Sequence, residues 1–205
     1  VRVIHVEAGL RSYDRSMPEE INRVLTDQIS DLLFTTEKSA LANLQREGID
    51  PARVEFVGNV MIDTLYRNLE RAVPASRTLG ATLPQYAVLT LHRPSNVDDP
   101  ATLAALLDVV GDINRRLPVV MPLHPRTRGS IEKFGFTDKL DGLHVLPPVG
   151  YLEMLGLMRD AKLVLTDSGG IQEETTALGV PCPTLRENTE RPITLEEGTN
   201  TLVGS

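Results

Sequence analysis

The sequence has no tryptophan, and aromatic residues make up only 4% of its 205 residues. Proteins that hold bases or sugars on aromatic rings need such side chains at the site, so we expect no stacking platform for either ligand. Cysteine is equally scarce. Cys182 is the single cysteine, which excludes an internal disulfide and is typical of a reducing, cytoplasmic location. We expect its side chain to be a small buried hydrophobic group.

Long apolar runs and an excess of positive charge are also missing. No stretch approaches the roughly 20 apolar residues that a membrane-spanning helix needs, and nothing resembles a signal peptide. The formal net charge of −7 gives no basic surface for nucleic acid or for an anionic membrane, so we expect neither as a partner. The remaining composition, 41% hydrophobic and 24% charged, is typical of a soluble globular protein. The chain starts and stops abruptly in strand-like residues, and we interpret it as an excerpt from a longer protein.

Strand-like and helix-like patterns alternate along the chain, which predicts a parallel sheet covered by helices on both faces. The apolar, β-branched runs of strand length are residues 1–6, 32–36, 54–58, 86–91, 118–123, 144–146, 163–166 and 181–185. Residues 74–84 lack periodicity and contain two prolines, so we expect a loop or linker there.

The helix after the first strand has clear start signals. Pro18 suits the first helical position, and Glu19 and Glu20 follow in the first turn, where the helix dipole favours carboxylates. Apolar residues at helical spacing predict the buried side of this helix: Ile21, Val24, Leu25, Ile29 and Leu32.

Polar residues recur where the predicted strands end. These residues are Glu7, His92, Arg93, His124, Asp167 and Ser168. In open parallel sheets, ligands bind at the carboxyl ends of the strands. The recurrence at several strands therefore predicts a binding site along this edge.

The segment DSGGIQEE, residues 167–174, carries the most specific local signal. It follows the strand LVLT and leads into a helix, so the free N–H groups of the first helical turn point outward. Gly169 and Gly170 have no Cβ that would keep a phosphate away from the backbone, and Ser168 is expected at the N-cap. This pattern predicts capture of a phosphate or diphosphate, with Glu174 one turn further on as an acceptor for a ribose diol. The same residues also fit a glycine-containing turn whose polar side chains only cap a helix.

Six segments form one ordered series along the chain: HVEAGLR (5–11), PEEINR (18–23), GNVMIDTL (58–65), LHRPSNVDD (91–99), TDSGGIQEE (166–174) and RENTERPIT (186–194). Together they closely resemble the non-hydrolysing UDP-N-acetylglucosamine 2-epimerases, from the first residues of the chain to the last. TDSGGIQEE followed by ENTERP is highly specific for that family.

The resemblance implies an α/β fold of the GT-B type, with two Rossmann-like, doubly wound domains on either side of a nucleotide-sugar cleft. It implies that residues 1–66 are the C-terminal part of the first domain, which is only partly present. It also implies that residues 67–205 are a second, UDP-binding domain without its C-terminal helices. Without the opening strands, we expect an unpaired edge at residues 1–6 and an exposed side on the helix from Pro18. A homodimer is implied for the full-length protein.

Inversion at C2 of an N-acetylhexosamine is difficult because C2–H is not next to a carbonyl. No G-x-G-x-x-G segment follows any predicted strand, so a nicotinamide route has no support, and we expect neither a cofactor nor a metal. The other route to inversion at C2 is expulsion of UDP from C1, which requires that the charge developing on UDP is stabilised. Ser168, Gly169, Gly170 and the helix dipole can supply this, with His92 and Arg191 as helpers.

The resemblance implies that Glu7 and Glu19 act as acid and base around C2 and that Glu174 binds the ribose. Elimination would give 2-acetamidoglucal and UDP, and re-addition with the proton on the other face would give UDP-N-acetylmannosamine. The residues alone leave simpler roles open. Glu7 is also placed for a salt bridge to Arg11, and Glu19 is the i,i+4 neighbour of Arg23.

Two segments depart from the pattern of many bacterial members. Those members have two arginines and a Glu after the His that matches His92, and a longer loop after the His that matches His124. Here they read HRPSN, with His92 and Arg93, and HPRTR, with His124. In those relatives the two segments help to bind a second, activating substrate molecule. His124 and Arg93 are therefore a possible remnant of this allosteric site, and we expect activation to be weak or absent.

Three other functions fit parts of the pattern. A GT-B glycosyltransferase would share the nucleotide edge but would not need the carboxylates of HVEAGLR and PEEINR. A hydrolysing epimerase would release free N-acetylmannosamine. A fragment that only binds a nucleotide sugar would have no turnover. The main hypothesis is an isomerase that interconverts UDP-N-acetylglucosamine and UDP-N-acetylmannosamine.

Overall fold

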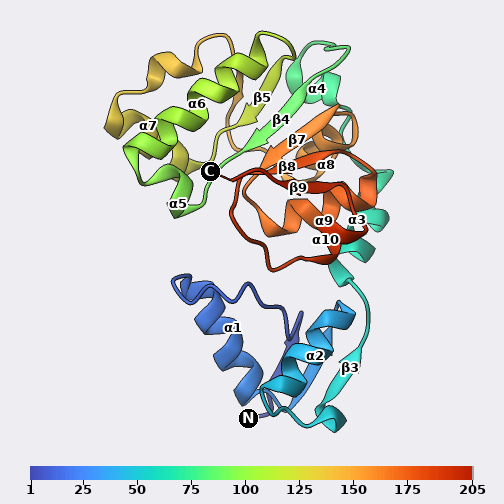
Figure 1. Cartoon of the computed structure of the whole chain (residues 1–205). Coiled ribbons are helices and arrows are strands. Elements are labelled where there is room, and N and C mark those ends of the chain that lie inside the picture. Colours follow the sequence, from blue (N-terminus) through green and yellow to red (C-terminus); the bar gives the residue numbers. More distant parts are fainter. Residues whose placement is uncertain (205) are drawn as a thin grey trace. The chain divides into compact units, whose positions relative to one another are not determined.

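The computed structural model describes residues 1–204, which fall into two compact units (Figure 1). Unit 1 comprises Val1–Thr64 together with Asn188–Ile193, and unit 2 comprises Leu65–Glu187 and the residues from Thr194 on. The division lies two residues before the expected boundary at residues 66 and 67, and 188–193 was expected in the second domain. Hydrogen bonds from this segment to the start of the chain explain its place in unit 1. The domain roles stay predictions.

Unit 1 is built on a parallel sheet in the order β1-β2-β3. Its elements are β1 (Ile4–Val6), α1 (Pro18–Ile29), β2 (Leu32–Thr35), α2 (Lys38–Arg46), the 3₁₀ turn η1 (Pro51–Arg53), β3 (Val54–Phe56) and the start of α3 (Val60–Leu69). Ala8, Leu33, Leu44 and Ile49 form the buried core on the α2 side of the sheet. Among the described strands, β1 pairs with β2 alone, so the expected open edge is present.

Helix α1 begins at Pro18 as expected, but its predicted buried side is wrong. Ile21, Leu25 and Ile29 are 40%, 58% and 70% exposed. The buried residues of this helix are Glu20 and Asp27 instead, because both carboxylates accept hydrogen bonds from the loop that follows β1. Leu32, the last residue of the predicted stripe, belongs to β2. The exposed side agrees with the expectation that one face of this helix is uncovered.

Unit 2 contains a parallel sheet in the order β6-β5-β4-β7-β8-β9. Its strands are β4 (Ala87–Thr90), β5 (Val119–Pro122), β6 (His144–Leu146), β7 (Leu163–Thr166), β8 (Cys182–Thr184) and β9 (Asn200–Leu202). Its helices are α4 (Ala75–Leu79), α5 (Pro94–Val97), α6 (Pro100–Asn114), α7 (Pro125–Phe134), α8 (Tyr151–Arg159), α9 (Gly169–Leu178) and α10 (Ile193–Glu196), with the 3₁₀ turn η2 (Thr137–Leu140). The expected α/β architecture is confirmed.

The sheet of unit 2 is covered on both faces, as the apolar runs predict. Ala87 and Leu89 of β4 pack with α6 and α7, while Val88 between them packs with α8. Figure 1 shows α6 and α7 on one side of β4 and β5, with α8 and α9 on the other. Successive side chains of a strand point to opposite faces, so each strand contributes to two cores. Cys182 is 1% exposed in β8, which confirms that it is a buried hydrophobic group.

The linker expected at 74–84 is partly wrong, because it contains α4. Ala75 is buried at the start of this short helix, and its N–H donates to the Asp160 carboxylate at 3.3 Å. A single helical turn is too short for an apolar period to reveal it. Two more one-turn helices, α5 and α10, escaped prediction for the same reason.

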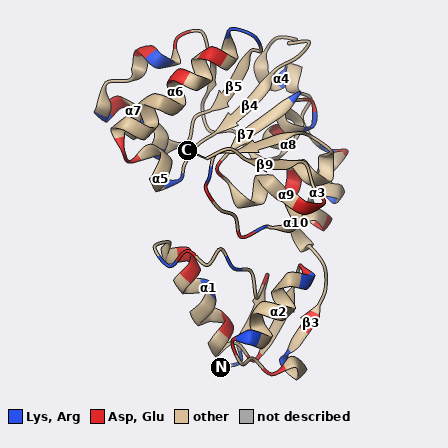
Figure 2. Cartoon of the chain, viewed as in Figure 1, with Lys and Arg blue, Asp and Glu red and all other residues tan. Residues whose placement is uncertain are grey.

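The described surface carries charges of both signs. Figure 2 shows Lys and Arg interspersed with Asp and Glu along the helices and loops. In the described part of the chain, no helix combines the length and hydropathy needed to cross a membrane.

Candidate functional site

Two central strands of unit 2 deliver polar residues to the same point of the sheet edge. β4 and β7 pair in parallel, with Thr90 opposite Thr166, and the two hydroxyl groups lie 2.7 Å apart. The chain therefore leaves the sheet side by side at His92 and Asp167. This adjacency brings together two of the strand-end residues singled out above.

Asp167 is fully buried and accepts hydrogen bonds from several groups after β4. The backbone N–H groups of His92 and Arg93 donate to it at 3.0 and 2.9 Å, and the Asn96 amide donates at 3.2 Å. Its other oxygen lies 2.8 Å from Nδ1 of His92. Burial raises the pKa of Asp167, but the bonds from His92 and from these N–H groups outweigh it, and the pKa lies below its ordinary value. The group is therefore a buried carboxylate anion.

A pocket of about 330 Å³ opens beside this pair. One part of its lining is polar, with His92, His124 and Ser168, and the two imidazole rings lie 5.6 Å apart. The other part is apolar and consists of Leu91, Pro122, Pro148, Val149, Met154 and Ile171. A ligand with a flat apolar base and a charged end matches this division.

The glycine segment forms the N-terminus of α9, beside the same pocket. Ser168 occupies the N-cap position as expected, and the helix begins at Gly169 and Gly170. The Ser168 hydroxyl does not cap the helix, contrary to its expected role. Instead, the Ser168 N–H donates to Thr166 Oγ1 at 3.0 Å, which fixes the turn from the strand side. The first-turn N–H groups have no acceptor within the helix and can bind an anion.

Glu174 lies on α9 and is 7% exposed. Burial raises its pKa above the ordinary value, and a hydrogen bond from the Tyr151 hydroxyl offsets part of this rise. Burial, the charge of Glu174 and the same hydrogen bond raise the pKa of Tyr151 to about 12. Tyr151 therefore remains a donor at all physiological pH values and holds the carboxylate in place.

In unit 1, Glu7 lies directly after β1 in a left-handed backbone conformation, with φ 71°. Such a conformation is uncommon for a residue with a side chain and costs about 1 kcal/mol or more. Arg191 donates to its carboxylate at 3.5 Å. The alternative salt bridge of Glu7 with Arg11 is wrong, since Arg11 donates to Asp27 and Glu47 at 2.7 and 2.6 Å.

Glu19 is exposed in the first turn of α1. The proposed i,i+4 pairing with Arg23 is wrong, because Arg23 donates to Glu20 at 3.0 Å. Glu20 also accepts from the backbone N–H groups of Ser12 and Tyr13 at 3.1 and 2.9 Å. Of the two adjacent carboxylates, Glu20 stabilises the loop and Glu19 remains available for a ligand.

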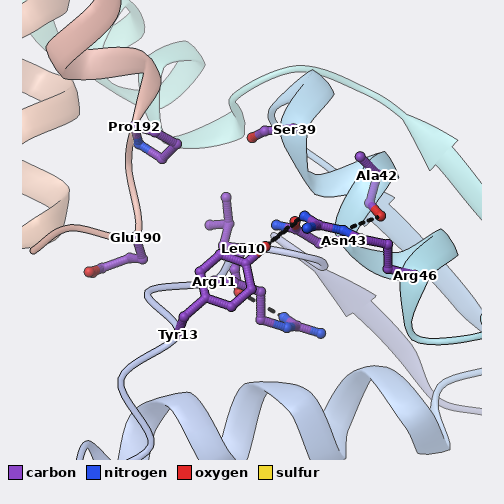
Figure 3. Close-up of a pocket in the computed structure, with 9 residues that line it drawn as sticks. All are labelled: Leu10, Arg11, Tyr13, Ser39, Ala42, Asn43, Arg46, Glu190 and Pro192. Carbon is purple, nitrogen blue, oxygen red and sulfur yellow. Dashed lines mark hydrogen bonds between the residues drawn. The ribbon is translucent and has the colours of Figure 1, made fainter.

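A second pocket, of about 220 Å³, lies in unit 1 and is lined by Leu10, Arg11, Tyr13, Ser39, Ala42, Asn43, Arg46, Glu190 and Pro192 (Figure 3). Its polar side chains bond to one another. The Tyr13 hydroxyl donates to Asn43 at 2.6 Å, and Arg46 donates to that hydroxyl at 2.7 Å. These contacts hold the loop after Glu7 against α2.

Comparison with known proteins decides the family. The family described as UDP-N-acetylglucosamine 2-epimerase matches residues 1–205. The chain belongs to the UDP-N-acetylglucosamine 2-epimerase family. This family member is 44% identical to the UDP-N-acetylglucosamine 2-epimerase of Methanococcus maripaludis, over 100% of this chain and 59% of the relative. It is 46% identical to a UDP-2,3-diacetamido-2,3-dideoxy-D-glucuronate 2-epimerase of Pseudomonas aeruginosa, over 100% of this chain and 57% of that protein.

A solved structure of the family extends the likeness to three dimensions. The crystal structure of Methanocaldococcus jannaschii UDP-GlcNAc 2-epimerase in complex with UDP-GlcNAc and UDP matches with a TM-score of 0.93 and 45% identity, over 100% of this chain and 59% of that one. The fold of this chain is thus α/β and GT-B-like. The chain spans about 59% of the length of the relatives it matches.

The predicted site residues are divided between the two units. Glu7, Glu19 and Arg191 belong to unit 1. His92, Arg93, His124, Ser168, Gly169, Gly170 and Glu174 belong to unit 2. His124 caps α7 by accepting from the Arg126 N–H at 3.2 Å, and Arg93 Nε donates to the Asp167 carbonyl at 3.3 Å. The roles of all these residues, including the activator remnant at His124 and Arg93, stay predictions.

Sequence reasoning missed two partners in the candidate site, Asp167 and Tyr151. Asp167 was noted at a strand end, but its bond to His92 depends on which strands are neighbours. Tyr151 opens α8, and no local pattern links it to Glu174. Among the described residues, no group of three His, Cys, Asp or Glu side chains is arranged to hold a metal ion.

Proposed function

We propose that the protein interconverts UDP-N-acetylglucosamine and UDP-N-acetylmannosamine without hydrolysis, by elimination of UDP and its re-addition. The observation that carries this proposal is the pocket of unit 2, where an apolar wall adjoins two imidazoles, Ser168 and the N-terminus of α9. Further support comes from the relative of known structure, which was crystallised with UDP-GlcNAc and UDP.

The diphosphate binds to the first turn of α9, where Gly169 and Gly170 present N–H groups backed by the helix dipole. The Ser168 hydroxyl makes no capping bond to the helix, and it adds a hydrogen-bond donor where this residue lines the pocket. The uracil occupies the apolar part of the pocket, and the ribose diol donates to Glu174. A carboxylate already fixed by Tyr151 loses little side-chain entropy when it accepts these bonds.

The elimination begins at C1. The C1–O bond breaks, and its electron pair passes to the β-phosphate oxygen of UDP. This charge is stabilised by the α9 N–H groups, His92 and Arg191. As C1 loses electron density, C2–H becomes acidic and one carboxylate removes the proton, so that the C2–H electron pair forms the C1–C2 double bond.

Glu7 and Glu19 handle the C2 proton on opposite faces of the sugar. One removes it to give 2-acetamidoglucal and the other returns a proton when UDP adds again, which inverts C2. Support comes from their surroundings. Glu7 accepts from the Arg191 guanidinium, and Glu19 is exposed while the neighbouring Glu20 makes the hydrogen bonds that hold the loop. Re-addition of UDP rather than water distinguishes this route from a hydrolysing epimerase.

A second substrate is supported by one observation. The identity to the UDP-2,3-diacetamido-2,3-dideoxy-D-glucuronate 2-epimerase is 46% over the whole chain, as high as to the UDP-N-acetylglucosamine enzymes. The chemistry at C1 and C2 is the same for both sugars, which differ at C3 and C6. The two candidate substrates are therefore compared in one assay.

The assay supplies each UDP-sugar to the protein in D₂O and identifies the products by NMR. We expect UDP-N-acetylmannosamine from UDP-N-acetylglucosamine, with deuterium at C2 in both sugars. Free N-acetylmannosamine would indicate a hydrolysing epimerase, and transfer to an added acceptor would indicate a glycosyltransferase. Turnover of the diacetamido glucuronate alone would replace the proposed substrate, and binding without turnover of either sugar would contradict catalysis.

The role of the glycine turn is tested by Gly170→Ala. We expect UDP affinity to fall by about 1–3 kcal/mol, since a methyl group on the first turn disturbs hydrogen bonds to a charged partner. The fold should persist, because alanine favours a helix. Calorimetric titration with UDP measures the change. Gly111→Ala is the matched control, since a Cβ there meets nothing within 4 Å in α6, and equal UDP affinity of the two variants would exclude the glycine turn as the diphosphate site.

A further inference from the structure

The two oxygens of Asp167 have different partners. Oδ2 accepts from the backbone N–H groups of His92 and Arg93 at 3.0 and 2.9 Å and from the Asn96 amide at 3.2 Å. Oδ1 accepts a longer bond from the His92 N–H at 3.2 Å and lies 2.8 Å from Nδ1 of the His92 ring. Oδ2 thus fixes the backbone turn, and Oδ1 is directed at the imidazole.

The short contact determines where the ring carries its proton. A carboxylate anion only accepts hydrogen bonds, so Nδ1 of His92 must be the donor. The nitrogen left for a ligand is Nε2, and the ring lines the pocket together with Ser168. In the neutral ring Nε2 is an acceptor, and in the imidazolium it is a second donor.

The geometry points to Asp167 as the positioning residue of His92: it holds the ring with Nδ1 protonated and supports an imidazolium whose Nε2–H serves the departing diphosphate. This inference rests on the proposed function and assigns a residue to one step of it. When the C1–O bond breaks, the proton on Nε2 passes to, or is shared with, the β-phosphate oxygen that receives the electron pair. In the reverse addition the same proton returns to Nε2, so the step is balanced.

Of the groups around the His92 ring, Asp167 is the one that contacts the imidazole directly. Asp167 approaches from the end of β7 as a fully buried anion, while His124 approaches from the end of β5 with its ring 5.6 Å away. His124 accepts at Nδ1 from the Arg126 N–H, so this nitrogen is already engaged within its own turn. Arg93 donates to the backbone carbonyl of Asp167. The carboxylate is the group in direct contact with the His92 ring.

The different roles of the two oxygens make Asp167→Asn a selective probe. The backbone N–H groups can only donate, so the amide oxygen must take the place of Oδ2 and keep three hydrogen bonds. The amide NH₂ then takes the place of Oδ1 and donates to Nδ1 of His92. The ring is forced into the opposite tautomer, with the proton on Nε2, and the imidazolium loses its partner.

The first test measures the tautomer in the unsubstituted protein. In ¹⁵N-labelled protein, NMR spectra of the imidazole nitrogens distinguish the two neutral tautomers, and His92→Asn identifies the His92 signals among the 4 histidines. We expect the Nδ1–H tautomer for the neutral ring of His92. The Nε2–H tautomer in the unsubstituted protein would overturn the inference, whatever the protein catalyses.

The second test compares Asp167→Asn with Asn96→Ala. We expect Asp167→Asn to switch His92 to the Nε2–H tautomer, to lower kcat by about two to four orders of magnitude and to leave KM within a few-fold. Asn96→Ala removes the donor to Oδ2 and to the Leu185 carbonyl but no donor to Oδ1, so the His92 tautomer should not change. An unchanged kcat or an unchanged tautomer in Asp167→Asn would overturn the inference. Absence of epimerase activity in the unsubstituted protein would instead refute the proposed function, and the tautomer result would still be valid.

Discussion

Glu19→Gln is expected to slow epimerisation by about two to four orders of magnitude, the usual effect of losing a general acid or base. UDP affinity should stay unchanged, because Glu19 is not among the proposed diphosphate contacts, which are the first-turn N–H groups of α9, His92 and Arg191. Glu19 is exposed in the first turn of α1, and its neighbour Glu20 makes the hydrogen bonds that hold the loop. Glutamine has the same shape, so the fold should not change. Steady-state kinetics with UDP-N-acetylglucosamine and calorimetric titration with UDP measure the two quantities.

Glu20→Gln is the matched control at the next position. It weakens the bonds to the Ser12 and Tyr13 N–H groups and the pairing with Arg23 at 3.0 Å, so we expect it to lower the free energy of unfolding. Glu19→Gln should leave that free energy as it is. Normal turnover by Glu19→Gln, or recovery of product from D₂O with the original hydrogen at C2, would be incompatible with carboxylate chemistry at this position.

The sequence predicts most of unit 2 because its strands are continuous apolar runs between turn residues. Strands buried on both faces need such runs, and the alternation with helices implies parallel pairing. The strand order was out of reach, since neighbours in the sheet are far apart in the chain. His92 and Asp167 were each noted at a strand end, but only the pairing of β4 with β7 makes them a hydrogen-bonded pair.

Unit 1 shows where an apolar pattern misleads. Ile21, Leu25 and Ile29 are spaced like a buried stripe, yet all three are exposed. The face of α1 that packs is defined by Asp27 and Glu20, whose partners lie in a loop with no periodicity. Helical spacing shows which residues share a face, but hydrogen-bond partners distant in sequence decide which polar face is buried.

The last prediction concerns that polar face: Asp27→Asn should lower the free energy of unfolding of unit 1 by about 3–5 kcal/mol, the range for breaking a buried ion pair. Asp27 is fully buried and accepts from Arg11 at 2.7 Å, from His5 at 2.6 Å and from the Gly9 N–H at 3.1 Å. Arg11 is itself 5% exposed. An amide cannot accept from all three donors and carries no charge, so the buried guanidinium loses its fully buried charge partner and keeps Glu47 at 2.6 Å.

The same contacts predict how the stability of unit 1 depends on pH. Burial raises the pKa of Asp27, but the bonds from His5 and Arg11, the charge of Arg11 and the Gly9 N–H outweigh it, so the pKa is lower in the folded state than in the unfolded state. The unfolded chain therefore binds the proton first as the pH falls. The stabilisation is complete above the ordinary carboxylate value of about 4 and is lost as the pH falls through the lower folded value. In Asp27→Asn this acid-dependent loss should be absent.

Asp27→Asn should also reduce catalysis without touching a ligand. Asp27 holds Gly9 and Arg11 on the loop that carries Glu7 in its left-handed conformation, and a displacement of about 1 Å at a catalytic group can lower the rate about 100-fold. Urea titrations followed by hydrogen exchange of residues 5–13 measure the stability. Asp31→Asn is the control, because Asp31 is exposed and its bond from the Val3 N–H at 2.7 Å survives in an amide. Equal protection of residues 5–13 in the two variants would show that the buried pair does not support the Glu7 loop.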